Sequence, residues 1–319
     1  MCVINTDCCY PAHTMIVVCD ISALRINDRF PRSLLPCSSN DPIVPTLTEQ
    51  DLTILDLASF NRSVGDLHAI VPSKCERRHP RGIISHVCST PLPPSSIETV
   101  KPAVGVASIA LTAVLMSRTM DDYSLIRFLY ELCATHRVED YRTRHKPLAS
   151  VDMLKSELGR LGCIRGSKRI LELLDFVADN SASPRETDLA MLAWLPHHLG
   201  GYGLPMGEMN RTIGVGGSDR RCDLLFRKQK VGVEYDSDEA HAGRENIARD
   251  SARRKVLENG GYRVVPITNG EFSDRELSFE AMRLVGKCLG SRVRKPRGAG
   301  AVARERLFRF VCSMHVPFF

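Results

Sequence analysis

Apolar and polar residues alternate between residues 221 and 236, and this period of two predicts a β-hairpin. The apolar positions are Leu224, Phe226, Val231, Val233 and Tyr235. The polar segment 227–230 lies between the two apolar runs and predicts the turn. A four-residue turn pairs Phe226 with Val231, which sets the register of the predicted hairpin.

In that register two acidic side chains lie opposite each other. Asp223 pairs with Glu234, and directly opposed residues have Cβ atoms roughly 4.5–5.5 Å apart, so their like charges are destabilising. A hard divalent cation such as Mg²⁺ takes carboxylate oxygens as ligands and would remove this penalty. A solvated face of an exposed hairpin would also accommodate both acids, but Leu225 and Gly232 share that face, so it is not simply polar.

The remaining hydrophobic pattern predicts an α/β protein. In the N-terminal half, apolar runs predict strands at 15–19, 67–71 and 82–86, and helical spacing predicts helices at 48–60, 104–118, 124–134, from 150, and at 167–177. Further along, the pattern predicts a helix at 184–195, a Gly- and Pro-rich loop at 196–218, the hairpin, a helix at about 243–259, a strand at 262–268 and a helix at 274–289.

The polar segment Asp179–Ser183 is the best candidate for a domain boundary. It separates a mainly helical α+β domain at 15–180 from a second domain at 181–290. Residues 291–319 are expected to form a basic tail, and residues 1–14 an irregular leader. Met15 opens the first predicted strand and is a candidate for the true start of translation.

Composition narrows the class of protein without naming a function. Hydrophobic residues at 43% and charged residues at 25% are typical of a soluble globular protein, and the net charge of +6 permits nucleic-acid binding. The longest apolar run, 104–116, is shorter than the roughly 20 residues of a membrane-spanning helix. The twelve cysteines show no zinc-ligand spacing, and a reducing cytoplasm is the simplest compartment for them.

A strong helix start precedes the hairpin. Ser183 suits the N-cap position, Pro184 the first helical position and Glu186 the third, which together form a capping box. Glu186 therefore has a complete structural explanation. The functional alternative is that its carboxylate also points toward Asp223 and Glu234.

Further candidate site residues lie at the end of the hairpin and after it. Asp236 follows Glu234 on the same face and either helps to position a metal-bound water or ends the strand as a polar residue. His241 either caps the next helix or carries a proton. Arg249 and Arg253 share one face of that helix, where they form surface ion pairs or contact DNA phosphates.

Residues 183–268 resemble the PD-(D/E)XK nuclease superfamily, and most closely the bacterial endonuclease-like domains related to very-short-patch-repair enzymes. The matching segments are Ser183-Pro-Arg-Glu186, Asp223-Leu-Leu-Phe226, Val233-Glu-Tyr-Asp236 with His241, and Arg249-Asp250 through Gly261-Tyr-Arg-Val-Val265. The resemblance implies a restriction-endonuclease-like mixed β-sheet flanked by helices. It also implies that Asp223 and Glu234 hold Mg²⁺ or Mn²⁺, with Glu186 as an accessory carboxylate, for hydrolysis of DNA.

One position departs from the superfamily pattern. The usual lysine, two residues after the glutamate, is Asp236 here, so the general base would be His241 or a water held by Asp236. The N-terminal half is similar to regulators of the AbiEi antitoxin type. The sequence therefore predicts a metal-dependent DNA endonuclease or nickase. The alternatives are a catalytically inactive, DNA-binding regulator with the nuclease fold and a purely structural interaction protein.

Overall fold

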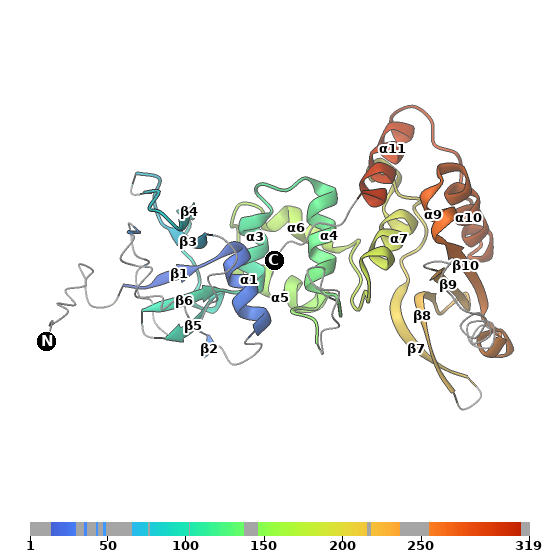
Figure 1. The fold of residues 1–319 in the computed structure, drawn as a ribbon, viewed down its shortest axis with the longest axis horizontal. Coiled ribbons are helices and arrows are strands. Elements are labelled where there is room, and N and C mark those ends of the chain that lie inside the picture. Colours follow the sequence, from blue (N-terminus) through green and yellow to red (C-terminus); the bar gives the residue numbers. More distant parts are fainter. Residues whose placement is uncertain are drawn as a thin grey trace, which may run out of the picture. The chain divides into compact units, whose positions relative to one another are not determined.

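The chain folds into two compact units, and each contains a mixed sheet with helices packed on it, which confirms the predicted α/β fold (Figure 1). The computed structural model describes residues 14–29, 35–36, 43, 47–48, 66–75, 77–101, 103–136, 146–215, 218–236 and 255–313. The first unit lies within residues 1–120 and 152–172, and the second within residues 121–151 and 173–318.

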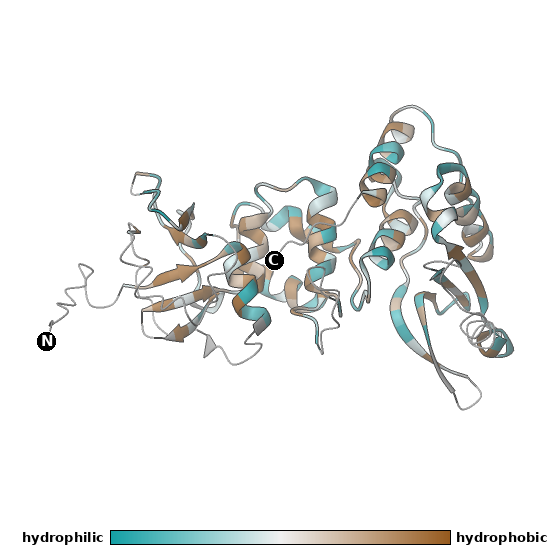
Figure 2. Cartoon of the chain, viewed as in Figure 1, coloured by the Kyte–Doolittle hydropathy of each residue, from teal (hydrophilic) through white to brown (hydrophobic). Residues whose placement is uncertain are grey.

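A six-stranded sheet forms the centre of the first unit, in the order β2-β5-β6-β1-β3-β4. Its strands are β1 (Ile16–Val18), β2 (Leu35–Pro36), β3 (Leu67–Val71), β4 (Ile83–Val87), β5 (Ile97–Lys101) and β6 (Val104–Ala107). The inner strand β1 pairs parallel with β6 and antiparallel with β3. All its residues are buried and hydrophobic (Figure 2), as expected for a strand covered on both faces.

Helices α1 (Asp20–Arg29) and α3 (Ile109–Met116) pack on each other and on β6. Every residue of α3 is buried, and the side chain of Ser108 caps its first turn by accepting a hydrogen bond from the Leu111 backbone N–H at 3.3 Å. Among the described residues, α3 is followed by α4 (Asp122–Leu132), α5 (Val151–Leu161) and α6 (Ser167–Leu174), and η2 (Pro94–Ser96) is a single 3-10 turn before β5.

The predictions for the first unit hold in part. The strands predicted at 67–71 and 82–86 are β3 and β4, but the helix predicted at 104–118 is wrong over its first residues, where β6 forms. Buried strands and buried helices both have continuous apolar runs, so the run itself did not distinguish them. Helix α1 and strands β2 and β5 were not predicted, and the helix predicted at 48–60 lies outside the described residues apart from Thr48.

The second unit contains a four-stranded sheet in the order β10-β9-β8-β7. Its strands are β7 (Glu208–Val215), β8 (Ser218–Phe226), β9 (Val231–Asp236) and β10 (Arg263–Thr268). Neighbours pair antiparallel from β7 to β9, whereas β9 and β10 are parallel. Helix α7 (Pro184–Trp194) packs on β8 and β9, and α10 (Arg275–Cys288) packs on β10.

Strand β7 corrects the prediction of a loop at 196–218. Met209 and Ile213 are buried, whereas Arg211, Thr212 and Gly214 are exposed. An edge strand with so few apolar residues lacks the alternation that predicts a strand, and its pairing with β8 supplies the stability that its own sequence does not.

Part of the segment predicted as a basic tail, 291–319, is helical: its residues 299–312 form helix α11 (Ala299–Cys312) within the second unit. Arg304 is 7% exposed and donates hydrogen bonds to the carbonyl oxygens of Gly200 and Gly201, the latter at 2.7 Å. Its guanidinium lies 3.5 Å from the centre of the Tyr202 ring. In the sequence, a buried arginine cannot be distinguished from an exposed one, which explains why α11 was not predicted.

The predicted boundary at Asp179–Ser183 lies inside the second unit. The backbone N–H of Thr135 donates to the Ser181 carbonyl at 2.8 Å, so the segment after α4 is hydrogen-bonded to the segment before α7. The contact pattern therefore groups residues 121–151 with the C-terminal half of the chain. The predicted leader lies outside the described residues, except for Thr14.

The described helices are short compared with the thickness of a bilayer. The longest, α10 and α11, have 14 residues each, whereas a membrane-spanning helix needs about 20. Within the described ranges, no helix combines the length and apolar character that crossing a membrane requires.

Candidate functional sites

The β8–β9 hairpin has the register that the sequence predicts. Phe226 pairs with Val231, and the ladder continues through Leu225 with Gly232 to Leu224 with Val233. Residues 227–230 form the turn. The ladder of paired residues is therefore continuous up to the position next to Asp223.

Asp223 contacts β9 beside Glu234. Its Oδ2 accepts a hydrogen bond from the backbone N–H of Tyr235 at 2.8 Å, and Tyr235 is the residue after Glu234. The side chain of Asp223 is half-buried, and Glu234 is only 8% exposed. A backbone N–H donor stabilises the ionised form of a carboxylate, which offsets part of the repulsion expected between the two acids.

Glu186 acts in the cap of its own helix. The Ser183 side chain accepts a hydrogen bond from the Glu186 backbone N–H at 3.2 Å, and Pro184 occupies the first helical position, as predicted. The Glu186 carboxylate accepts from the Ala182 backbone N–H at 2.8 Å, one residue before the N-cap, and not from the Ser183 N–H as the predicted capping box requires. It also accepts from the Asn210 side-chain amide.

Asn210, on β7, connects the Glu186 carboxylate to a basic surface and was not among the predicted site residues. Its amide also donates to the Asn180 carbonyl at 3.0 Å, and its Oδ1 accepts from Arg221 at 2.8 Å. A positive φ of 50° at Asn210 interrupts the regular strand, a conformation that asparagine tolerates better than most residues. The sequence signal was hidden because this residue lies in the segment predicted as a loop.

A pocket of about 620 Å³ opens beside Asn210 in the second unit. It is lined by Thr135, Asn180, Glu208, Asn210, Arg211, Thr212, Arg221 and Arg227. Nε of Arg227 donates a hydrogen bond to Oε1 of Glu208 at 3.0 Å, and this bond lowers the pKa of the Glu208 carboxyl group. Glu208 is therefore ionised at neutral pH, and the three arginines leave the lining with an excess of positive charge.

The remaining predicted site residues lie at or beyond the end of β9. Asp236 is the last residue of that strand and is half-buried. His241, Arg249 and Arg253 lie outside the described residues. Glu186, Asp223, Glu234 and Asp236 do not include three carboxylates with oxygens within 4.8 Å of one another.

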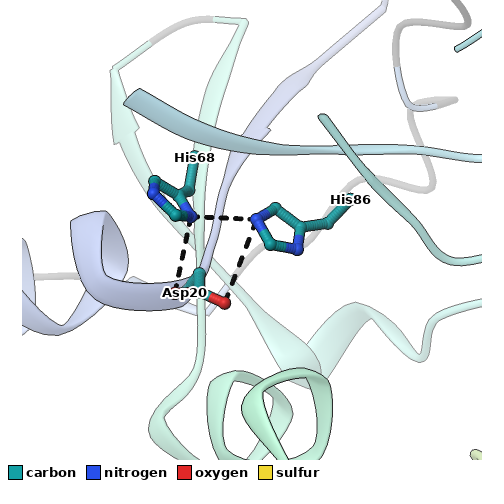
Figure 3. Close-up of side chains that lie close together, drawn as sticks. All are labelled: Asp20, His68 and His86. Carbon is teal, nitrogen blue, oxygen red and sulfur yellow. Dashed lines mark hydrogen bonds and ion pairs between the residues drawn. The ribbon is translucent and has the colours of Figure 1, made fainter. Parts of the chain in front are cut away.

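One group in the described part of the chain does meet that spacing, and it lies in the first unit. It consists of Asp20 at the start of α1, His68 on β3 and His86 on β4 (Figure 3). Strand β3 pairs with β1 on one side and with β4 on the other, and Asp20 follows β1 by two residues. The pairing of the three strands thus brings together residues that are far apart in the sequence.

The three side chains point toward a common centre (Figure 3). Nδ1 of His68 lies 2.9 Å from Nε2 of His86 and 3.4 Å from Oδ1 of Asp20. Nε2 of His86 lies 3.9 Å from Oδ2 of Asp20. The imidazole rings stack with centroids 5.0 Å apart, so both rings are held against each other.

Burial lowers the pKa of both His68 and His86, and the charge of Asp20 opposes that shift only in part. Both imidazoles are therefore neutral near pH 7. Asp20 adopts a φ of 54°, which is uncommon for a residue other than glycine and recurs at functional sites. Its Oδ1 accepts a hydrogen bond from the Ile21 backbone N–H at 2.7 Å, which fixes the carboxylate.

Asp20, His68 and His86 were not predicted as a group because no sequence motif joins them. His68 and His86 each lie within a correctly predicted strand, but nothing in the spacing of isolated histidines shows that β3 and β4 are neighbours. The signal that could have drawn attention to them is a polar side chain inside each of two short apolar strands.

No protein-family model matches the chain, and no solved structure matches it. Two uncharacterized proteins of Mycobacterium tuberculosis, from strains CDC 1551 / Oshkosh and ATCC 25618 / H37Rv, are each 35% identical to the chain over 104 residues. The match covers 32% of this chain and 36% of each relative, so the chain spans about a third of the length of these curated relatives.

Proposed function

We propose that the second unit is a metal-dependent DNA endonuclease or nickase, with Asp223 and Glu234 as the metal ligands. The observation that carries this proposal is the hydrogen bond from the Tyr235 backbone N–H to Asp223, which holds the Asp223 carboxylate against the residue that follows the buried Glu234 on β9.

The donor set suits a hard cation. Carboxylate oxygens are the ligands that Mg²⁺ and Mn²⁺ prefer, and Asp223 and Glu234 would hold such an ion between β8 and β9. The bound ion would supply an activated water and would stabilise negative charge on the phosphate. Asp236 would orient that water, and His241 would carry a proton.

The arginine-lined pocket supports DNA as the substrate. Arg211 and Arg221 lie on β7 and β8, the same strands that carry Asn210 and Asp223. Arginine binds phosphate oxygens through its planar, permanently charged guanidinium. We assign the pocket to backbone phosphates, with Arg249 and Arg253 as further phosphate contacts.

A DNA-binding regulator without hydrolytic activity is the second candidate, and one observation favours it. The Glu186 carboxylate is bound by the Ala182 N–H and by Asn210, so it serves the start of α7 and the neighbouring strand. In this alternative the pocket binds DNA, and the two carboxylates have no role in chemistry.

A plasmid-nicking assay with Mg²⁺ or Mn²⁺ separates the two candidates. The wild-type protein should nick supercoiled DNA, and Glu234→Gln should lower the rate by at least about 100-fold, since even groups that only orient metal ligands typically contribute 10–100-fold. Glu258→Gln, at an exposed glutamate, is the matched control and should retain activity. Undiminished nicking by Glu234→Gln would overturn the assignment, and metal-independent DNA binding without nicking by the wild-type protein would favour the regulator.

A further inference from the structure

We propose that Asp20, His68 and His86 form a binding site for a divalent transition-metal ion of the zinc class, separate from the carboxylates of the second unit. The three donors are two imidazole nitrogens and one carboxylate. Imidazole is a preferred ligand of zinc and of other first-row transition metals, whereas magnesium and calcium prefer oxygen alone.

The spacing of the donor atoms fits such an ion. Metal–ligand bonds of about 2.0–2.2 Å place neighbouring ligands of a tetrahedral ion about 3.4 Å apart and those of an octahedral ion about 3.0 Å apart. Nδ1 of His68 and Nε2 of His86 lie 2.9 Å apart, and each has an oxygen of Asp20 nearby: Oδ1 lies 3.4 Å from Nδ1, and Oδ2 lies 3.9 Å from Nε2. These values lie near the separations that either geometry requires, and one atom from each of the three residues lies within 4.8 Å of the other two. Shifts of a few tenths of an ångström would suffice to bind an ion.

Hydrogen bonds alone cannot satisfy all three of these side chains at the same time. Nδ1 of His68 faces both Nε2 of His86 and Oδ1 of Asp20 (Figure 3), and a single proton on this nitrogen can form a short, linear hydrogen bond to one of them only. A cation at the centre would interact with all three lone pairs at once. It would also neutralise the Asp20 carboxylate, whose side chain is 16% exposed.

The backbone holds the donors before any ion binds. His68 and His86 are fixed by the parallel β3–β4 ladder, and the backbone N–H of His68 donates to the Ser22 side chain at 3.1 Å, which ties β3 to α1. Asp20 is held by its left-handed backbone and by the Ile21 N–H. Preorganised donors of this kind lose little conformational entropy on binding.

The site would remain open to one further ligand. Three protein donors leave one position of a tetrahedral ion for water or an anion, the arrangement found in catalytic rather than structural zinc sites. The side chains of His68 and His86 are 18% and 27% exposed, so water can reach the ion.

Zinc titration by calorimetry tests the site, with single alanine variants of the two histidines. Wild-type protein stripped of metal should bind a Zn²⁺ ion whose affinity His68→Ala and His86→Ala each weaken by at least about 100-fold. His79→Ala, at an exposed histidine between β3 and β4, is the matched control and should bind as the wild type does. The proposed zinc site shares no residue with the carboxylates of the second unit, so failure of the proposed nuclease site would leave this result unchanged.

X-ray absorption on the wild-type zinc complex decides the question even if an alanine variant fails to fold. The expected spectrum shows nitrogen and oxygen ligands at about 2.0–2.2 Å, including two imidazoles. A sulfur shell at about 2.3 Å would assign the zinc to cysteine thiols, such as the exposed Cys75 and Cys163, and would overturn the proposal. Unchanged zinc affinity in both histidine variants, or no saturable binding by the wild type, would overturn it as well.

Discussion

Nη2 of Arg127 on α4 lies 2.8 Å from Oδ1 of Asp188 on α7, and both side chains are buried. The same guanidinium lies 3.9 Å from the centre of the Phe310 ring on α11 and donates to the Phe310 carbonyl at 3.1 Å. This ion pair therefore joins helices from three distant parts of the sequence. It explains why α4 belongs with the C-terminal half, although the predicted boundary lies between α4 and α7.

Replacing Asp188 should destabilise the second unit strongly. Asp188→Ala leaves the Arg127 charge buried without its carboxylate, and losses of this kind typically lower the free energy of unfolding by about 3–5 kcal/mol. Urea denaturation followed by circular dichroism measures the change. Glu280→Gln is the control, because its pair with Arg283 is exposed and should contribute at most about 1 kcal/mol. Equal effects of the two substitutions would contradict the role of the buried pair.

The turn of the β8–β9 hairpin offers a test of its geometry. Lys230 has a φ of 54°, and the left-handed conformation costs a residue other than glycine roughly 1–2 kcal/mol. Lys230→Gly should therefore raise the free energy of unfolding by about 1 kcal/mol. Lys228→Gly, in the same turn but without a positive φ, should lower it by about 0.5–1 kcal/mol. Urea denaturation measures both changes in the free energy of unfolding. Destabilisation by Lys230→Gly together with stabilisation by Lys228→Gly would mean that the turn has a different conformation.

The arginine-lined pocket predicts a salt-dependent DNA affinity. If Arg211 contacts a phosphate, Arg211→Ala should reduce the slope of log affinity against log salt concentration by about 1. Fluorescence anisotropy with a labelled duplex at several salt concentrations measures this slope. Arg283→Ala, at an exposed arginine of α10 outside the pocket, should leave the slope unchanged. A slope that responds equally to both substitutions would assign the binding to general surface charge.

Glu98 on β5 and Glu157 on α5 predict a pH dependence of stability in the first unit. Burial raises the pKa of Glu98 above its ordinary value of 4.5, and the negative charge of Glu157 raises it further; burial also raises the pKa of Glu157. A carboxyl group with a raised pKa in the folded state binds its proton more tightly there than in the unfolded chain. This contribution to stability is complete below the unfolded value and is lost as the pH rises through the folded value.

The melting temperature of the first unit should therefore fall as the pH rises from about 4.5, near the ordinary glutamate pKa, toward neutrality. Glu98→Gln should flatten that fall and raise the melting temperature at neutral pH. Glu172→Gln, at an exposed glutamate on α6, is the control and should keep the wild-type dependence. A steeper fall in the Glu98→Gln variant would contradict the repulsion between Glu98 and Glu157.

The elements that the sequence predicts well are those with a strong local pattern. The β8–β9 register follows from alternation and turn length, and the start of α7 follows from Ser183 and Pro184, because both depend on residues within a few positions of one another. Strand β7 and helix α11 were not predicted. Their stability comes from partners such as β8 and from the buried Arg304, which local periodicity does not record.

The sequence by itself determined the α/β class and the β8–β9 hairpin with its register from Phe226 to Leu224, since hydrogen bonding along a short ladder is a local property. The tertiary structure alone decided that the Glu186 carboxylate also binds Asn210, and that Asp20, His68 and His86 converge. The physical reason is that strand order depends on which apolar faces bury each other. The order β1-β3-β4 brings the two histidines to the aspartate, and no spacing along the chain specifies that order.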